Sequence, residues 1–84
     1  MTKKDIYIQV KDIISDIMGD EKNGDLLLET NLLEYGVNSL LFIRIVVNIE
    51  NQLDLEFDIA YLNLEKYVTL NDLIDYIAEQ VLVK

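Results

Sequence analysis

The chain has 84 residues, of which 51% are apolar, so it is long and apolar enough to bury the core of one folded domain. It contains no cysteine and no histidine, which excludes disulfides, thiol nucleophiles, the usual zinc sites and histidine acid–base catalysis. Its net charge of −9 disfavours nucleic acid and anionic membranes as partners and favours proteins with basic surfaces.

The first predicted helix covers residues 3–18. Its apolar side chains recur at steps of three and four and form one face, which consists of Ile6, Val10, Ile13, Ile14 and Ile17. Thr2 and Asp5 have the spacing of a capping box at its start. Gly19 can end the helix in the left-handed conformation.

A connection of about twenty residues follows, from Gly19 to Asn38, and so long a loop is uncommon in a compact domain unless it is functional. We expect apolar residues to hold it against the bundle, namely Leu26, Leu27, Leu28, Leu32, Leu33, Tyr35 and Val37. Its acidic stretch DEKNGDLLLE does not fit an EF-hand loop. Placing Gly24 at the sixth loop position puts Gly19 at the first, where a carboxylate is needed.

The middle helix is predicted over residues 39–53, SLLFIRIVVNIENQL. Its β-branched residues suit a strand, but fifteen residues without a turn signal are long for one. The spacing predicts a core face made of Leu40, Ile43, Val46, Ile49 and Leu53. Leu41 and Val47 then fall toward another side, with Phe42 and Ile45 at the margins.

A short third helix is predicted over residues 59–65, with Ile59, Leu62 and Leu64 pointing inward. The tyrosines are expected to be half-buried packing residues with their hydroxyls in water; they are Tyr7, Tyr35, Tyr61, Tyr67 and Tyr76.

The last helix is predicted over residues 70–82. Its apolar stripe consists of Leu70, Leu73, Ile74, Ile77 and Val81. Thr69 and Asp72 repeat the capping pattern, and Asp75 and Glu79 should face water. Three main helices, one short helix and a long pinned loop predict an all-α bundle.

The sequence has no glycine-rich phosphate loop and no nucleophile elbow. Its sixteen carboxylates lack a recognisable partner pattern, which favours a solvated acidic surface over acid–base chemistry or a metal site. We therefore do not expect catalysis by this chain.

The stretch LLEYGVNSLL places Ser39 where a turn meets a helix. Either Asn38 or Ser39 can cap that helix by accepting from its first free amides. The same position sets the Ser39 hydroxyl beside unpaired N–H groups and the positive end of the helix dipole, which favours an attached phosphate. The helix that follows has more apolar residues than one buried face can hold. The apolar residues left exposed therefore suggest a docking surface.

GVNSL, followed by LFIRIVVNIENQLDLEF and later YVTLNDLIDYI, resembles the acyl and peptidyl carrier proteins. Their G-x-[DN]-S-[LM] turn opens the second helix of a four-helix bundle, and the resemblance extends over essentially all of residues 1–84 as a single domain. It implies that Ser39 carries 4′-phosphopantetheine through a phosphodiester, with Gly36, Asn38 and Leu40 as its motif neighbours. The terminal thiol of this arm holds the cargo as a thioester, and the protein itself catalyses nothing.

The resemblance also implies partners. A phosphopantetheinyl transferase attaches the arm from coenzyme A with Mg²⁺, an adenylation or acyltransferase enzyme loads it, and synthase, condensation or tailoring enzymes use the cargo. We expect docking through Leu41, Arg44, Val47 and Glu50.

Two features depart from the common family pattern. Many members have aspartate before the serine, where this chain has Asn38, which offers no charge to a basic transferase or a metal. The second-helix face is not strongly acidic, and SLLFIRIV resembles the S-L-L-x-x-R-x-V run of peptidyl carriers. A nonribosomal peptide or polyketide-type pathway is therefore favoured. The alternatives are a fatty-acid carrier and a non-covalent acidic helical adaptor in which Ser39 is only a cap.

No apolar run reaches the roughly 18 residues that span a bilayer, and the first residues lack the pattern of a signal peptide. The chain starts at Met1 and has no linker at either end. We therefore expect a free-standing, monomeric, cytoplasmic carrier.

Overall fold

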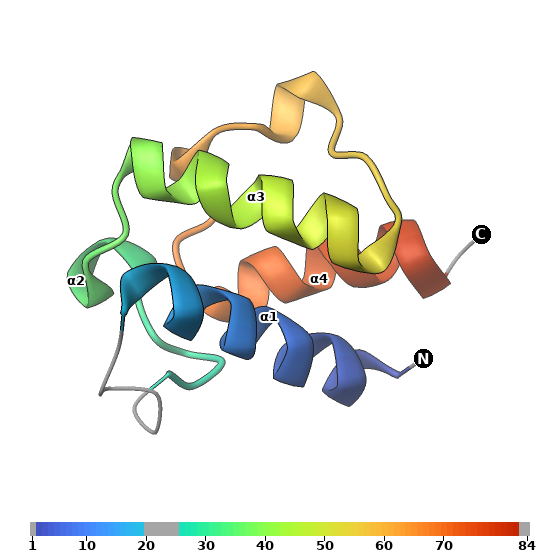
Figure 1. Cartoon of the computed structure of the whole chain (residues 1–84), viewed down its shortest axis with the longest axis horizontal. Coiled ribbons are helices and arrows are strands. Elements are labelled where there is room, and N and C mark those ends of the chain that lie inside the picture. Colours follow the sequence, from blue (N-terminus) through green and yellow to red (C-terminus); the bar gives the residue numbers. More distant parts are fainter. Residues whose placement is uncertain (1, 20–25, 83–84) are drawn as a thin grey trace.

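The computed structural model describes residues 2–19 and 26–82, and its described part is all α-helical with two 3-10 turns. Part of the acidic stretch for which an EF-hand was considered, residues 20–25, lies outside this range. In chain order the elements are α1 (Lys3–Met18), α2 (Leu32–Tyr35), α3 (Ser39–Leu53), η2 (Ile59–Tyr61), η3 (Leu64–Lys66) and α4 (Leu70–Leu82) (Figure 1). α1 packs against both α3 and α4. The predicted all-α bundle is confirmed.

The starts of α1 and α4 are fixed by the capping interactions that the sequence predicts. The Asp5 amide donates to Thr2 Oγ1 at 3.2 Å, and the Thr2 amide donates to Asp5 Oδ2 at 2.9 Å. These hydrogen bonds hold the pKa of Asp5 below its usual value, so the box is formed at neutral pH and is lost as acid protonates the carboxylate. At α4, Asp72 Oδ2 accepts from the Thr69 amide at 3.1 Å.

α3 has the predicted bounds, but it is rotated about its axis relative to the prediction. Its buried side chains are Phe42, Ile45, Val46 and Ile49. Leu40 and Ile43, predicted to be inward, are 73% and 43% exposed, so this part of the prediction was wrong. The helix carries two apolar stripes at helical spacing, and the stripe with the larger side chain, Phe42, faces the core, where its ring lies 5.5 Å from that of Tyr67.

The segment predicted as one short helix over 59–65 forms two separate 3-10 turns. Asp58 Oδ1 accepts from the Ala60 amide at the start of η2, and Asn63 Oδ1 accepts from the Glu65 amide at the start of η3. Because the Asn63 cap starts a second turn inside the predicted segment, the helix is not continuous. Leu64 is buried as predicted, but Ile59 and Leu62 are exposed, which contradicts the prediction that they point inward.

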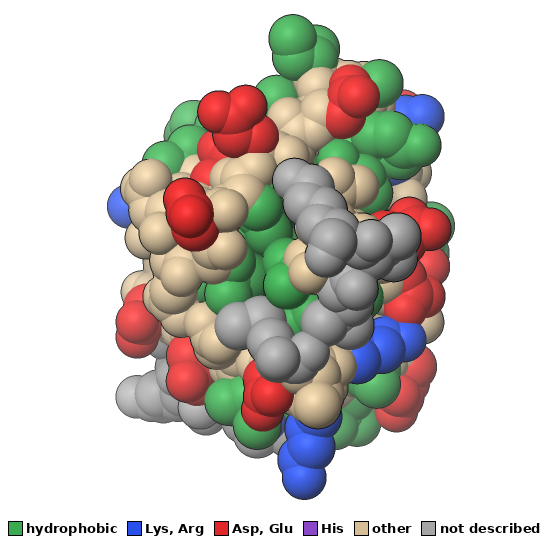
Figure 2. Space-filling model, turned by 90° about the vertical axis from the view of Figure 1, so that its right-hand side faces the viewer, with side chains coloured by type: hydrophobic (Ala, Val, Ile, Leu, Met, Phe, Trp, Pro, Cys, Tyr) green, Lys and Arg blue, Asp and Glu red, His purple; other side chains and the backbone are tan. Residues whose placement is uncertain are grey.

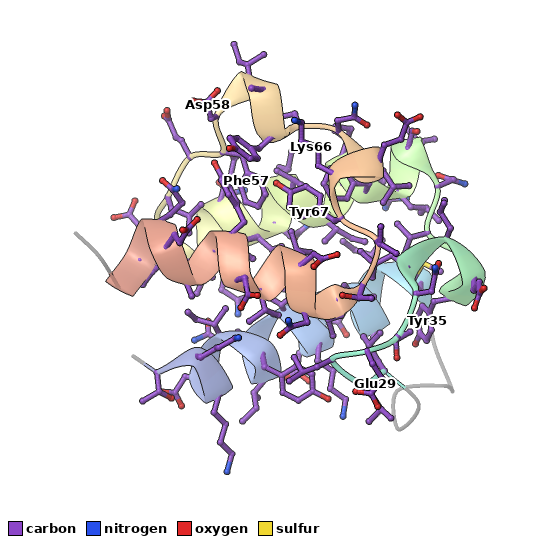
Figure 3. All side chains as sticks on the ribbon, turned by 180° about the vertical axis from the view of Figure 1, so that it is seen from behind. Glu29, Tyr35, Phe57, Asp58, Lys66 and Tyr67 are labelled. Carbon is purple, nitrogen blue, oxygen red and sulfur yellow. The ribbon has the colours of Figure 1, made fainter. Side chains whose placement is uncertain are left out.

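The hydroxyls of Tyr7, Tyr67 and Tyr76 are bonded to the protein, although all tyrosine hydroxyls were expected in water. Tyr7 Oη donates to the Leu26 carbonyl at 2.7 Å, and Tyr67 Oη donates to the Tyr61 carbonyl at 2.9 Å. Tyr76 Oη accepts from the Asp58 amide at 3.0 Å. Tyr67 and Tyr76 are buried rather than half-buried, and burial raises the pKa of Tyr67 above its usual value. Figure 3 shows Phe57 and Tyr67 between α4 and the 3-10 turns.

The connection before α3 is held against the bundle by some of the predicted residues. Leu26, Leu32 and Val37 are buried, whereas Leu27, Leu28 and Leu33 are exposed. The backbone adds to this attachment, because the Leu32 amide donates to the Val68 carbonyl and the Leu70 amide donates to the Thr30 carbonyl, both at 3.0 Å. α2, the four-residue helix within this connection, was not predicted from the sequence.

Alanine substitutions in α3 test its rotation. Ile49→Ala removes a fully buried side chain and should lower the free energy of unfolding by about 2–5 kcal/mol. The matched change Ile43→Ala, on the exposed stripe, should cost less than about 1 kcal/mol. Urea unfolding followed by circular dichroism measures both, and equal losses would contradict the described orientation of α3.

Candidate functional site

Ser39 is held in place by the turn that joins α2 to α3. α2 ends at Gly36, which has a φ of 113°, a conformation that glycine adopts most easily. Its amide donates to the Leu33 carbonyl at 3.1 Å. A Cβ at this position would lie 3.2 Å from Met18 Cε, so glycine also permits the close approach of the turn to the end of α1.

The next two residues fix the direction in which α3 begins. Val37 is buried, and its amide donates to the Leu32 carbonyl at 3.0 Å, which anchors the turn in the core. Asn38 is the N-cap, because its Oδ1 accepts from the Leu41 amide at 2.9 Å. Of the two capping candidates, the structure therefore uses Asn38, and the hydroxyl of Ser39 is left out of the cap.

Ser39 is the first residue of α3 and is exposed to solvent. Its hydroxyl stands at the positive end of a 15-residue helix, at the edge of the bundle next to α2 (Figure 1). An exposed hydroxyl at this place is accessible to another enzyme and accommodates a phosphodiester that points away from the core. The site therefore fits the covalent attachment of a phosphate-linked group.

An apolar stripe lies next to Ser39 on the exposed side of α3. Leu40, Ile43 and Val47 are 73%, 43% and 47% exposed, and their spacing places them on one face. We call these three residues the α3 face. Leu40 and Ile43 were predicted to lie in the core. The second apolar stripe of α3 is the feature of the sequence that could have identified them as exposed residues.

The residues predicted for docking are only partly on this exposed side. Arg44 and Val47 are exposed as expected. Leu41 is half-buried and packs against the core, and Glu50 is half-buried with its carboxylate accepting from the Phe57 amide at 2.8 Å. These two side chains contribute to the fold and present little surface to a partner.

The described part of the chain was searched for clusters of metal-ligating side chains and for helices that could cross a membrane. No group of three or more histidine, cysteine, aspartate or glutamate side chains there could hold a metal ion. Within the same residues, no helix is both long and apolar enough to cross a bilayer.

The chain matches the model of a known protein family. The family model described as a phosphopantetheine attachment site matches residues 9–77, which includes the whole turn from α2 to α3 and most of the bundle. No match was found among curated proteins.

The role of Asn38 as the cap can be tested by stability. Asn38→Ala removes the acceptor for the Leu41 amide and should lower the free energy of unfolding by about 0.5–2 kcal/mol. Asn38→Asp keeps the acceptor and adds a negative charge near the positive helix end, so it should be at least as stable as the parent. Thermal unfolding at low ionic strength measures both, and an Asn38→Ala variant as stable as the parent would contradict this assignment.

Proposed function

The chain belongs to the phosphopantetheine attachment-site family, which carries 4′-phosphopantetheine covalently, and we propose that Ser39 is the attachment residue. Members of this family are typically carriers without catalysis of their own, and they interact with phosphopantetheinyl transferases and synthases. The observation that carries the proposal is the exposed serine at the start of α3, whose hydroxyl the cap leaves available.

The residues around Ser39 present the hydroxyl but do not activate it. In the loading step the Ser39 Oγ bonds to the phosphorus of the pantetheine phosphate, and the pyrophosphate bond of coenzyme A breaks to release the nucleotide. The hydroxyl proton needs a base, which neither Asn38 nor Leu40 provides, and the chain has no histidine. We therefore assign the base and the Mg²⁺ to the transferase.

The bound arm supplies a thiol that holds acyl or aminoacyl cargo as a thioester, which explains how a chain without cysteine takes part in thioester chemistry. The contribution of this protein is positional. The Gly36 turn and the Asn38 cap keep Ser39 at a fixed edge of a folded bundle, so each partner enzyme meets the arm in the same place. We propose that the protein acts as a carrier and not as an enzyme.

We propose that partners bind the α3 face together with Arg44. These apolar side chains remain exposed in the folded protein, and burying them against a partner would remove apolar surface from water next to the attachment point. This surface carries an arginine and no acidic residue. That composition favours a nonribosomal peptide or polyketide-type pathway over fatty-acid synthesis, with a loading enzyme of the adenylation or acyltransferase type and condensation, synthase or tailoring enzymes as further partners.

Incubation with coenzyme A, Mg²⁺ and a broad-specificity phosphopantetheinyl transferase tests the attachment site. Intact-mass spectrometry should show a gain of one phosphopantetheinyl group for the parent protein and none for Ser39→Ala. Circular dichroism of Ser39→Ala should match the parent, because Ser39 is exposed. Absence of the gain in the parent would favour the non-covalent adaptor, and a gain in Ser39→Ala would place the site elsewhere.

Aspartate substitutions test the α3 face. Val47→Asp and Leu40→Asp should reduce kcat/KM for transfer to or from a partner enzyme by about tenfold, because each buries a charge in the apolar contact. The matched control is Ile8→Asp, which places the same charge on an exposed isoleucine of α1. Equal effects of all three variants would indicate a general charge effect instead of docking on α3.

A further inference from the structure

A cavity of about 260 Å³ lies between the N-terminal half of α1 and the connection that precedes α2. Four side chains from these two segments line it, namely Lys3, Lys4, Tyr7 and Leu28. None of the four is acidic, although the chain has 16 acidic residues and a net charge of −9. Figure 2 shows basic side chains at the lower end of the molecule, with apolar side chains next to them. The cavity therefore combines an apolar lining with positive charge.

Both walls of the cavity are held in place by hydrogen bonds of the folded protein. Tyr7 Oη donates to the Leu26 carbonyl at 2.7 Å, which joins α1 to the connection. The Leu28 carbonyl accepts from the Asn71 amide at 2.8 Å, which joins the connection to α4. The cavity is thus formed before a ligand arrives, and filling it requires little ordering of the protein.

Lys4 supplies the charge that a ligand can use. The Lys3 ammonium is already paired with the Asp75 carboxylate, and the Tyr7 hydroxyl is already bonded to the backbone. Lys4 is exposed, and its ammonium forms no ion pair with a carboxylate in the described part of the chain. Lys11, one turn beyond Tyr7, adds a second positive charge, with its Nζ 5.7 Å from the centre of the Tyr7 ring. The cavity thus has apolar groups inside and an available cation at its rim.

These features indicate a ligand with an apolar chain that ends in one negative charge. The chain can cover Leu28, the Tyr7 ring and the methylene stem of Lys4, while the charged end meets the Lys4 ammonium. A peptide fits less well, because these side chains offer few free partners for its backbone amides. A doubly charged phosphate is better bound by arginine or by several donors, whereas one ammonium suits a carboxylate. The cavity is smaller than the roughly 300–1,000 Å³ that is typical of pockets for drug-sized ligands, which indicates a short molecule.

We propose that this cavity binds a free, medium-length apolar carboxylate without a covalent bond. The site is separate from Ser39. α1 has 16 residues and is roughly 24 Å long at 1.5 Å per residue, and Met18 at its C-terminal end is the residue that meets the Gly36 turn before Ser39. Lys3 and Lys4 lie at the opposite end of the helix. We therefore assign the cavity to a free acid and not to cargo on an arm at Ser39, which takes the inference beyond the proposed carrier function.

Titration with sodium octanoate, followed by amide NMR spectra of the isotope-labelled protein, tests this site. The amide signals of Tyr7 and Leu28 should shift in a saturable way. Octylammonium has the same number of carbon atoms and the opposite charge, and it should shift these signals less. Non-specific binding would give the reverse order, because a protein with a net charge of −9 attracts cations. A preference for the anion is therefore diagnostic of the cavity.

Charge-reversal variants provide a matched control. Lys4→Glu should raise the dissociation constant for octanoate by about tenfold or more, because it replaces an attracting charge with a repelling one. Lys66→Glu makes the same change at an exposed lysine of η3, which is not among the residues that line the cavity, and its constant should stay close to that of the parent. Circular dichroism should show that both variants are folded, because both lysines are exposed.

Three outcomes overturn the inference. The first is that octanoate causes no saturable shift at Tyr7 and Leu28, or that octylammonium shifts them as much. The second is that Lys4→Glu and Lys66→Glu weaken octanoate binding equally. The third is that octanoate shifts the amides of the α3 face instead, where apolar side chains also lie beside an arginine. That last result would mean that exposed apolar surface next to a cation is sufficient, without the cavity between α1 and the connection.

Discussion

The rotation of α3 about its own axis is the constraint on which the proposed partner surface depends. The helix is apolar on two sides, and only one can face α1 and the core. Phe42 occupies the core beside Tyr67, and its burial turns Leu40, Ile43 and Val47 toward solvent. With the opposite rotation, the residues next to Ser39 would serve the core and Phe42 would be exposed. The packing of the core thus determines which side chains are exposed beside the proposed attachment residue.

The tyrosines connect the core to the surface in a second way. Tyr67 and Tyr76 are buried among aromatic rings, and their hydroxyls need partners there, since an unpaired buried hydroxyl is costly. Both find partners in the backbone around η2, at the Tyr61 carbonyl and the Asp58 amide. Satisfying the polar ends of core residues therefore fixes the shape of a surface turn. The same interactions stabilise the bundle and hold Ile59 in an exposed position.

The sequence allowed the helix bounds and the caps to be predicted because these depend on local signals. Thr2 with Asp5, Thr69 with Asp72, and Gly19 are recognisable from residue type and spacing alone. The side of α3 that is buried could not be derived in this way, since Phe42 gains its position from Tyr67, 25 residues further along the chain. The split of residues 59–67 into two turns likewise depends on competing caps at Asp58 and Asn63. The motif identified Ser39 and its neighbours as a candidate site, and the helical spacing contains both apolar stripes of α3, but it could not show which of the two is exposed.

If Ser39 carries the arm as proposed, the surface of the bundle is where partner enzymes distinguish this carrier from others. The chain contains neither cysteine nor histidine, and in the proposed function the thiol that holds the cargo belongs to the arm. A partner must then recognise this protein by shape, apolar contact and charge. We propose that the net charge of −9 attracts basic partners from a distance, an attraction that salt would weaken. In the same proposal, the uncharged stripe of α3 acts at short range and favours a partner that covers Leu40, Ile43 and Val47 over one attracted by charge alone. Long-range attraction and short-range selection are thus separated on the two kinds of surface that this small bundle presents.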